Sequence, residues 1–163
     1  MNVLTREKLL FIESQCVNPQ DAIIIRLLME GIEVHELVYL TQDALNETTR
    51  ILTIESPFGT SRKIQVSKRC AELFQHAAEQ TKYILENGYN PTKQNSVNLR
   101  HSPFLIKVSI HDYIANESMI MELDSVILRT IYMRLKKLAA FFSLPELVHL
   151  TTVRLEPEEK AYA

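Results

Sequence analysis

The chain has 163 residues, a length that suits a single domain with a hydrophobic core of its own. Three glycines and six prolines argue against linkers and low-complexity segments, and no apolar run is long enough to span a bilayer. No leader of basic and then apolar residues precedes the first predicted helix, so we expect a cytoplasmic protein that does not bind membranes.

Charge is unevenly distributed along the chain. The formal net charge is −2, which is not typical of a nucleic-acid-binding protein taken as a whole. Residues 1–49 carry three basic and eight acidic side chains, whereas residues 50–137 carry thirteen basic and eight acidic ones. This distribution permits one DNA-facing side without requiring it.

Helix start and stop signals divide the first forty residues. Thr5 is a predicted N-cap for a helix that runs to about Cys16, and Asn18-Pro19 predicts the start of a second helix. This second helix is apolar almost all round, which indicates that it is buried, and it ends at Glu30-Gly31. The segment GIEVHELVYLT, residues 31–41, predicts a short third helix, with a further turn over residues 41–47.

The spacing of apolar residues then changes to the two-residue alternation of β-strands. Residues 51–56 and 62–67 alternate in polarity and are rich in β-branched side chains, with a Pro-Phe-Gly-Thr turn between them. Ser67 then predicts the start of a long helix over residues 68–86, which ends at Asn87-Gly88. The apolar stripe predicted for this helix comprises Cys70, Leu73, Phe74, Ala77, Ala78 and Ile84.

The remainder of the chain predicts one more strand and two helices. Residues 89–103 are polar and predict irregular structure, and residues 104–109 predict a third strand. A helix is expected over residues 124–142 until Leu144-Pro145 ends it, and Thr151 or Thr152 is expected to cap a last helix. We therefore predict one α+β domain over residues 1–163, mainly α-helical, with a small antiparallel three-stranded sheet.

Residues 31–41 resemble a motif of tyrosine recombinases and phage integrases, which reads roughly G-L-R-(I/V)-S-E-L-x-x-L. The order of the elements is similar to their catalytic domain over nearly the whole chain. It includes a basic hairpin, a long helix opened by VSKRCAELF, and a later helix that contains RLKKLA before LPEL. The long helix and the polar loop after it most resemble phage-encoded relatives, including repressor-type members that keep the fold without the chemistry.

The resemblance also assigns positions to the recombinase chemistry. Arginine suits the stabilisation of a phosphate under attack, because a guanidinium offers two parallel donors to phosphate oxygens. Glu33 stands where the family has its first arginine, and its charge would repel the phosphate. Lys63 stands at the lysine position of the hairpin, while Thr151 and Arg154 stand at the histidine and arginine of the second box, roughly H-x-x-R.

The family's nucleophilic tyrosine lies several tens of residues beyond that second box. Tyr162 comes eight residues after Arg154, which is too close for the nucleophile. We therefore expect no catalytic residue, no metal and no cofactor in this chain, and no cleavage of DNA strands by it.

Six basic side chains are candidate contacts for DNA phosphates, and two of them lie in the first turn of a predicted helix, where anions are favoured. They are Arg62, Lys63, Lys68, Arg69, Arg134 and Arg154. The competing interpretation is a solvated hairpin and helix face. Glu36 matches a structural glutamate of the family, and two roles stay open for it: it bonds a backbone group or a nearby arginine, or it is a solvated surface residue.

The leading hypothesis is a degenerate recombinase-fold domain that binds double-stranded DNA, alone or as a homo-oligomer. It would be a phage or prophage protein that acts as a repressor or accessory factor in the cytoplasm or nucleoid of the bacterial host. Two alternatives stay open. One is a fragment of an active site-specific recombinase, and the other is a protein-interaction module that does not bind DNA.

Overall fold

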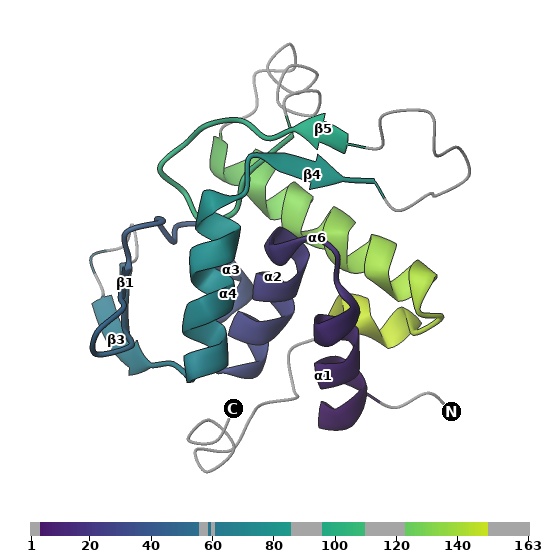
Figure 1. The fold of residues 1–163 in the computed structure, drawn as a ribbon, viewed down its shortest axis with the longest axis horizontal. Coiled ribbons are helices and arrows are strands. Elements are labelled where there is room, and N and C mark those ends of the chain that lie inside the picture. The colour runs from purple at the N-terminus through teal and green to yellow at the C-terminus, as the bar shows by residue number, and fades with distance from the viewer. Residues whose placement is uncertain (1–3, 56–58, 60, 86–95, 110–122, 150–163) are drawn as a thin grey trace.

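The structure of the protein is a computed structural model that describes residues 4–55, 59, 61–85, 96–109 and 123–149. Helices dominate these ranges, and the strands form one antiparallel sheet of three strands and one of two (Figure 1). The predicted fold class, α+β and mainly helical with a small three-stranded sheet, is confirmed. Within the same ranges, no helix is both long enough and apolar enough to cross a membrane.

The first three helices begin and end where their local signals predict. α1 (Arg6–Gln15) is capped by the side chain of Thr5, which accepts a backbone hydrogen bond from the first turn. α2 (Pro19–Met29) begins with its proline and ends before Gly31, whose φ of 103° is a conformation that glycine readily adopts. α3 (Val34–Leu37) follows at once and is a single turn.

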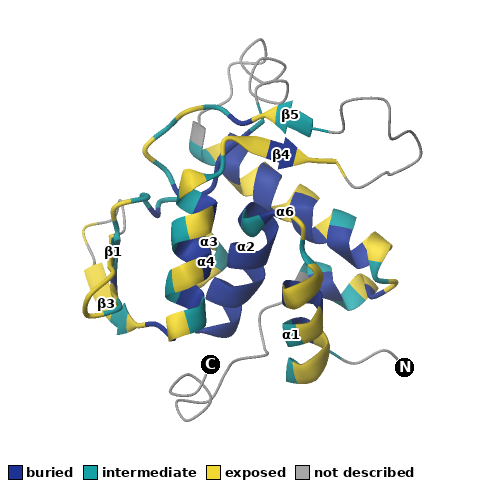
Figure 2. Cartoon of the chain, in the orientation of Figure 1, coloured by how far each residue is buried: buried dark blue, intermediate teal, exposed yellow. Residues whose placement is uncertain are grey.

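α2 is the centre of the core. All its residues from Gln20 to Met29 are buried, as its apolar surface predicts (Figure 2). It contacts α1, α4 (Lys68–Glu79) and α6 (Leu123–Phe141), so these helices bury their apolar faces against it.

The helix predicted over residues 68–86 is shorter than expected, because α4 ends at Glu79. The next residue, Gln80, is extended, and its side chain accepts a hydrogen bond from the backbone N–H of Gln20. The chain then forms β4 (Lys82–Ile84), which pairs antiparallel with β5 (Ser96–Asn98). The predictions of helix at residues 82–84 and of irregular structure at residues 96–98 are therefore wrong. The predicted helix end at Asn87-Gly88 lies outside the described residues.

The predicted hairpin is confirmed. β2 (Ile51–Glu55) pairs with β3 (Ser61–Gln65) in an antiparallel register that places Leu52 opposite Ile64. The third strand of this sheet is β1 (Leu45–Asn46), which lies in the segment predicted as a helical turn. Residues 104–109, predicted as the third strand, form isolated bridges at Phe104 and Ser109 instead.

α6 begins and ends within one residue of its predicted bounds. Ser143 turns the chain with a φ of 53°, and Leu144 and Pro145 lead into the short helix η1 (Pro145–His149), which packs against α6. The final predicted helix, after Thr151 or Thr152, lies outside the described residues. The predicted inward face of α6 is buried at Val126, Ile127, Ile131, Leu135 and Leu138.

Candidate functional site

The start of α3 carries the residue that the resemblance singles out. Glu33 is the N-cap of α3, and its side chain is 60% exposed beside the imidazole of His35, with 3.3 Å between Oε2 and Nδ1. Glu36 closes the turn, because its Oε1 accepts a hydrogen bond from the backbone N–H of Glu33 at 2.9 Å. A carboxylate therefore faces solvent at the position that the resemblance matches to the family's first arginine.

Arg62 of β3 is held against this turn by Glu36. Its Nη2 and Nε donate to the two carboxylate oxygens of Glu36 at 2.7 and 2.8 Å, and Nη2 also donates to the carbonyl oxygen of Gly31. These hydrogen bonds lower the pKa of the Glu36 carboxyl, and the same pair raises the pKa of Arg62. The prediction that Glu36 bonds a backbone group or an arginine is confirmed. Because both oxygens of Glu36 engage Arg62, this arginine is already neutralised.

The register of the hairpin separates Arg62 from its neighbour Lys63. Arg62 lies opposite the buried Ile54, so it is on the face of the sheet that packs toward the core. Lys63 lies opposite Thr53 on the other face and is exposed. The two basic residues therefore do not belong to one surface.

Basic side chains come from three segments that follow one another in the chain: the turn before β2, strand β3 and the first turn of α4. We call Arg50, Lys63, Lys68 and Arg69 the basic surface. The carbonyl oxygen of Arg50 accepts a hydrogen bond from Val66 at 2.9 Å, which brings Arg50 beside the chain that leads from β3 into α4. Lys68 is exposed and Arg69 half-buried, and both lie in the first turn of α4, which holds no acidic residue.

Arg50 was not predicted from the sequence. Its φ of 59° places it in a left-handed turn just before β2. The signal for that turn is Asn46, whose side chain accepts hydrogen bonds from the backbone of Thr48 and Thr49.

A buried ionic cluster fixes the start of α4, and hence the positions of Lys68 and Arg69. Arg26 of α2 is 1% exposed and donates to Glu30 at 2.7 Å and to the hydroxyl of Ser67 at 2.9 Å. Ser67 donates in turn to Glu30 and accepts the N–H of Cys70, so the N-cap of α4 is joined to α2. Burial raises the pKa of the Cys70 thiol well above its usual value, so it is a poor nucleophile.

The same cluster contains a second acid from α1. Glu13 lies 3.7 Å from Nη1 of Arg26, measured to its Oε2, and its other oxygen is buried with no hydrogen-bond partner among the described residues. Burial, opposed by the charge of Arg26, raises the pKa of the Glu13 carboxyl.

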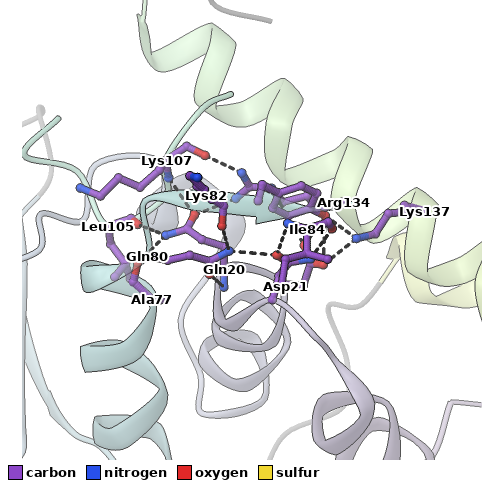
Figure 3. Close-up of polar contacts among 12 residues, drawn as sticks. Gln20, Asp21, Ala77, Gln80, Lys82, Ile84, Leu105, Lys107, Arg134 and Lys137 are labelled. Atoms are coloured by element: carbon purple, nitrogen blue, oxygen red, sulfur yellow. Dashed lines mark hydrogen bonds and ion pairs between the residues drawn. The ribbon is translucent and has the colours of Figure 1, made fainter. Parts of the chain in front are cut away.

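Arg134, a predicted phosphate contact, points into the protein. Its side chain is 7% exposed, with Nη1 donating to Gln20 at 2.8 Å and Nη2 donating to the carbonyl oxygen of Lys107 at 2.5 Å (Figure 3). Its guanidinium also stacks over the ring of Tyr83, 4.9 Å from the centroid. The described contacts give Arg134 a structural role, and they leave it apart from the basic surface.

Gln20 is the centre of this second polar cluster. Its amide nitrogen donates to the carbonyl oxygens of Ala77 and Leu105, and its amide oxygen accepts from Lys107 and Arg134 (Figure 3). One side chain of α2 thus joins α4, α6 and the segment around residue 105.

Asp21, the next residue, is fully buried and is bonded by Tyr83 and Lys137. No role was predicted for these polar residues of α2. Their presence in an otherwise apolar helix was the available signal, because buried polar groups need partners.

Two of the predicted site residues, Thr151 and Arg154, lie outside the described residues, as does Tyr162. Among the residues that the structure describes, no three His, Cys, Asp or Glu side chains are grouped so that they could hold a metal ion.

A protein family and a prophage protein both match this chain. The family model described as MrpR, C-terminal catalytic domain, matches residues 3–154. The SPbeta prophage-derived uncharacterized protein YopR of Bacillus subtilis (strain 168) is 32% identical over 110 residues, which is 64% of this chain and 34% of that protein. The chain therefore spans about a third of the length of this curated relative.

Proposed function

Because the chain belongs to the family of the MrpR C-terminal catalytic domain, which is of the tyrosine recombinase type, we propose that it binds duplex DNA without cutting it. The proposed role is that of a repressor-like or accessory factor of a phage or prophage. The relative from Bacillus subtilis is prophage-derived, which supports this assignment.

The observation that carries the proposal is the contrast between the basic surface and the neighbouring turn of α3. At that turn, Glu33 is an exposed carboxylate and Arg62 is engaged by Glu36. A carboxylate at this position repels a phosphate, and a neutralised arginine offers little charge to a transition state. The turn is thus unsuited to phosphoryl transfer.

DNA binding is assigned instead to the basic surface. Lys63 and Lys68 are exposed, and Lys68 and Arg69 lie beside the backbone N–H groups that open α4. The helix dipole makes cations unfavourable at this end, so their placement has a small stability cost that an approaching phosphate would offset. Contacts of this kind position a protein on DNA but do not read its sequence.

The test is a salt titration of DNA binding by fluorescence anisotropy. Each phosphate neutralised on duplex DNA contributes about −0.9 to the slope of log affinity against log salt concentration. Replacing both Lys68 and Arg69 by alanine should weaken binding similarly on every duplex sequence and make the slope shallower by about two units. The matched control replaces Arg129 and Lys136, which are exposed on α6, and removes the same charge. Equal slopes for wild type and the Lys68/Arg69 variant would refute the assigned surface.

An active recombinase is the second candidate, because the matching family model is described as a catalytic domain. A supercoiled-plasmid relaxation assay on the longest natural form of the protein separates it from the proposal. Relaxed plasmid or a covalent protein–DNA adduct would show strand cleavage and overturn the inactive assignment. Retained supercoils, together with salt-dependent binding, are the expected result.

A further inference from the structure

A cavity of about 390 Å³ lies between the β4–β5 pair and α6, away from the basic surface. Its wall is mostly apolar, formed by Leu85 of the β4 segment, Val97 of β5 and Met133 of α6. Its polar lining includes Thr130, Arg134 and Lys137, all on α6. The volume falls within the range of small-molecule sites, roughly 300–1,000 Å³, and is too small for a folded partner.

Among the described residues, the charges at one end of this cavity do not cancel. Asp21 is the carboxylate that faces this end, with 2.7 Å from its Oδ2 to Nζ of Lys137 and 4.0 Å from its Oδ1 to Nε of Arg134 (Figure 3). The described residues that line the cavity include two cations and no acid. One buried carboxylate against two cations leaves one positive charge in excess among these residues.

Lys137 is the cation that a ligand can reach. An ammonium group has three N–H donors, and the described contacts use two of them, to Asp21 and to the hydroxyl of Tyr83. Its side chain is 32% exposed, whereas that of Arg134 is directed to Gln20 and Lys107. Asp21 and the Tyr83 ring, 4.6 Å from the ammonium, hold Nζ in place before any ligand arrives.

From this arrangement we propose that the cavity binds a small organic monoanion with an apolar body. The anionic group, a carboxylate in the simplest case, accepts a hydrogen bond from Lys137, and the body packs against Leu85, Val97 and Met133. A cation would meet two like charges, and a neutral ligand would leave the excess charge uncompensated. The proposal does not depend on DNA binding, because the cavity and the basic surface share no residue.

The experiment compares 4-phenylbutyrate with its neutral isostere 4-phenylbutyramide, each titrated into the 163-residue chain by two-dimensional NMR. The carboxylate should bind about tenfold more tightly than the amide, since a charge-assisted hydrogen bond is roughly twice as strong as a neutral one. Binding should shift the backbone resonances of Val97, Thr130 and Met133. Equal affinities, no binding of the carboxylate, or shifts confined to other elements would overturn the proposal.

Three variants test the site without touching the buried cluster. Met133 lines the cavity and is 45% exposed, so polar residues are tolerated there. Met133→Glu places a negative charge at the cavity and should weaken 4-phenylbutyrate binding at least fivefold relative to Met133→Gln, which matches it in shape. Tyr132→Glu adds the same charge one residue away, at a side chain that is 42% exposed and does not line the cavity. It should leave the affinity within twofold, and equal losses in all three variants would contradict the site.

Discussion

Two arginine–glutamate clusters, one buried and one at the surface, join elements that are distant in sequence. In the buried cluster, Arg26 and Glu30 have side chains that are 1% and 0% exposed, and they join α2 to the start of α4. In the surface cluster, Arg62 and Glu36 are 46% and 13% exposed, and they join β3 to α3. The donor and acceptor chemistry is the same, and the hydrogen bonds are equally short.

The environment of the two clusters decides what each does. A buried ion pair that loses one partner leaves a charge without compensation in a medium of low polarity, and this is costly. At the surface, water replaces the lost partner and reduces the cost. The buried cluster therefore affects mainly the stability of the fold, whereas the surface cluster affects mainly the charge that the candidate site presents.

The largest effect should follow from removing the central cation of the buried cluster. Arg26→Ala leaves Glu13 and Glu30 buried together, and we expect the free energy of unfolding to fall by about 3–5 kcal/mol. Arg62→Ala, the matched change in the surface cluster, should cost at most about 1 kcal/mol. Urea denaturation of both variants measures the difference. Similar losses in the two would mean that burial does not distinguish the clusters.

A smaller loss is expected where the buried side chain is neutral. Gln20→Ala removes the amide group that donates to the carbonyl oxygens of Ala77 and Leu105 and that accepts two further hydrogen bonds. The free energy of unfolding should fall by about 1–3 kcal/mol. Gln65→Ala is the surface counterpart, since Gln65 is exposed, and it should change stability by less than about 0.5 kcal/mol. Both values come from the same denaturation experiment, and a Gln20 variant as stable as the Gln65 variant would contradict the buried network.

The two clusters should respond to pH in opposite directions through their acids. The pKa of Glu13 is raised above 4.5 by burial, so the folded state binds its proton more tightly than the unfolded chain does. Glu13 therefore lowers stability as pH rises above 4.5. Glu13→Gln should stabilise the protein by about 1 kcal/mol at pH 7, because an unsatisfied buried charge is removed, and the gain should vanish below pH 4.5.

Glu36 provides the opposite case. Its pKa is lowered below 4.5 by Arg62, so its contribution is complete above that value and is lost as pH falls. Glu36→Gln should cost at most about 1 kcal/mol at pH 7, after allowance for solvent screening, and less at low pH. Thermal unfolding between pH 3 and pH 7 compares the two variants, and pH trends of the same sign would contradict this assignment.

The smallest effect on stability is expected at Glu33, where the effect on DNA is the relevant one. Glu33→Arg changes an exposed side chain and should alter stability by less than about 0.5 kcal/mol. If the turn of α3 faces DNA, affinity should rise up to about tenfold at low salt, because a repulsion becomes an attraction. No strand cleavage should appear. Glu7→Arg, an equal charge change on α1, is the control, and equal affinities would show that Glu33 lies away from DNA.

Much of this molecule was determined by local sequence. The N-caps Thr5 and Ser67, the proline at the start of α2 and the glycine at its end act within one helical turn, and all lie where predicted. The apolar surface of α2 predicted its burial, and the alternation in residues 51–56 and 62–67 predicted the hairpin. The resemblance carried by residues 31–41 pointed to the family that the comparisons show.

Tertiary structure decided the rest, because the deciding partners lie far away in the sequence. α4 stops at Glu79 although the sequence beyond it favours a helix, since residues 82–84 pair with β5 and the side chain of Asn18 bonds both backbone groups of Ile84. The contacts between Asn18 and Ile84 span 66 residues, so no local signal reports them. Whether Arg134 faces DNA or Gln20, and on which face of the sheet Lys63 lies, likewise follows from how the elements pack.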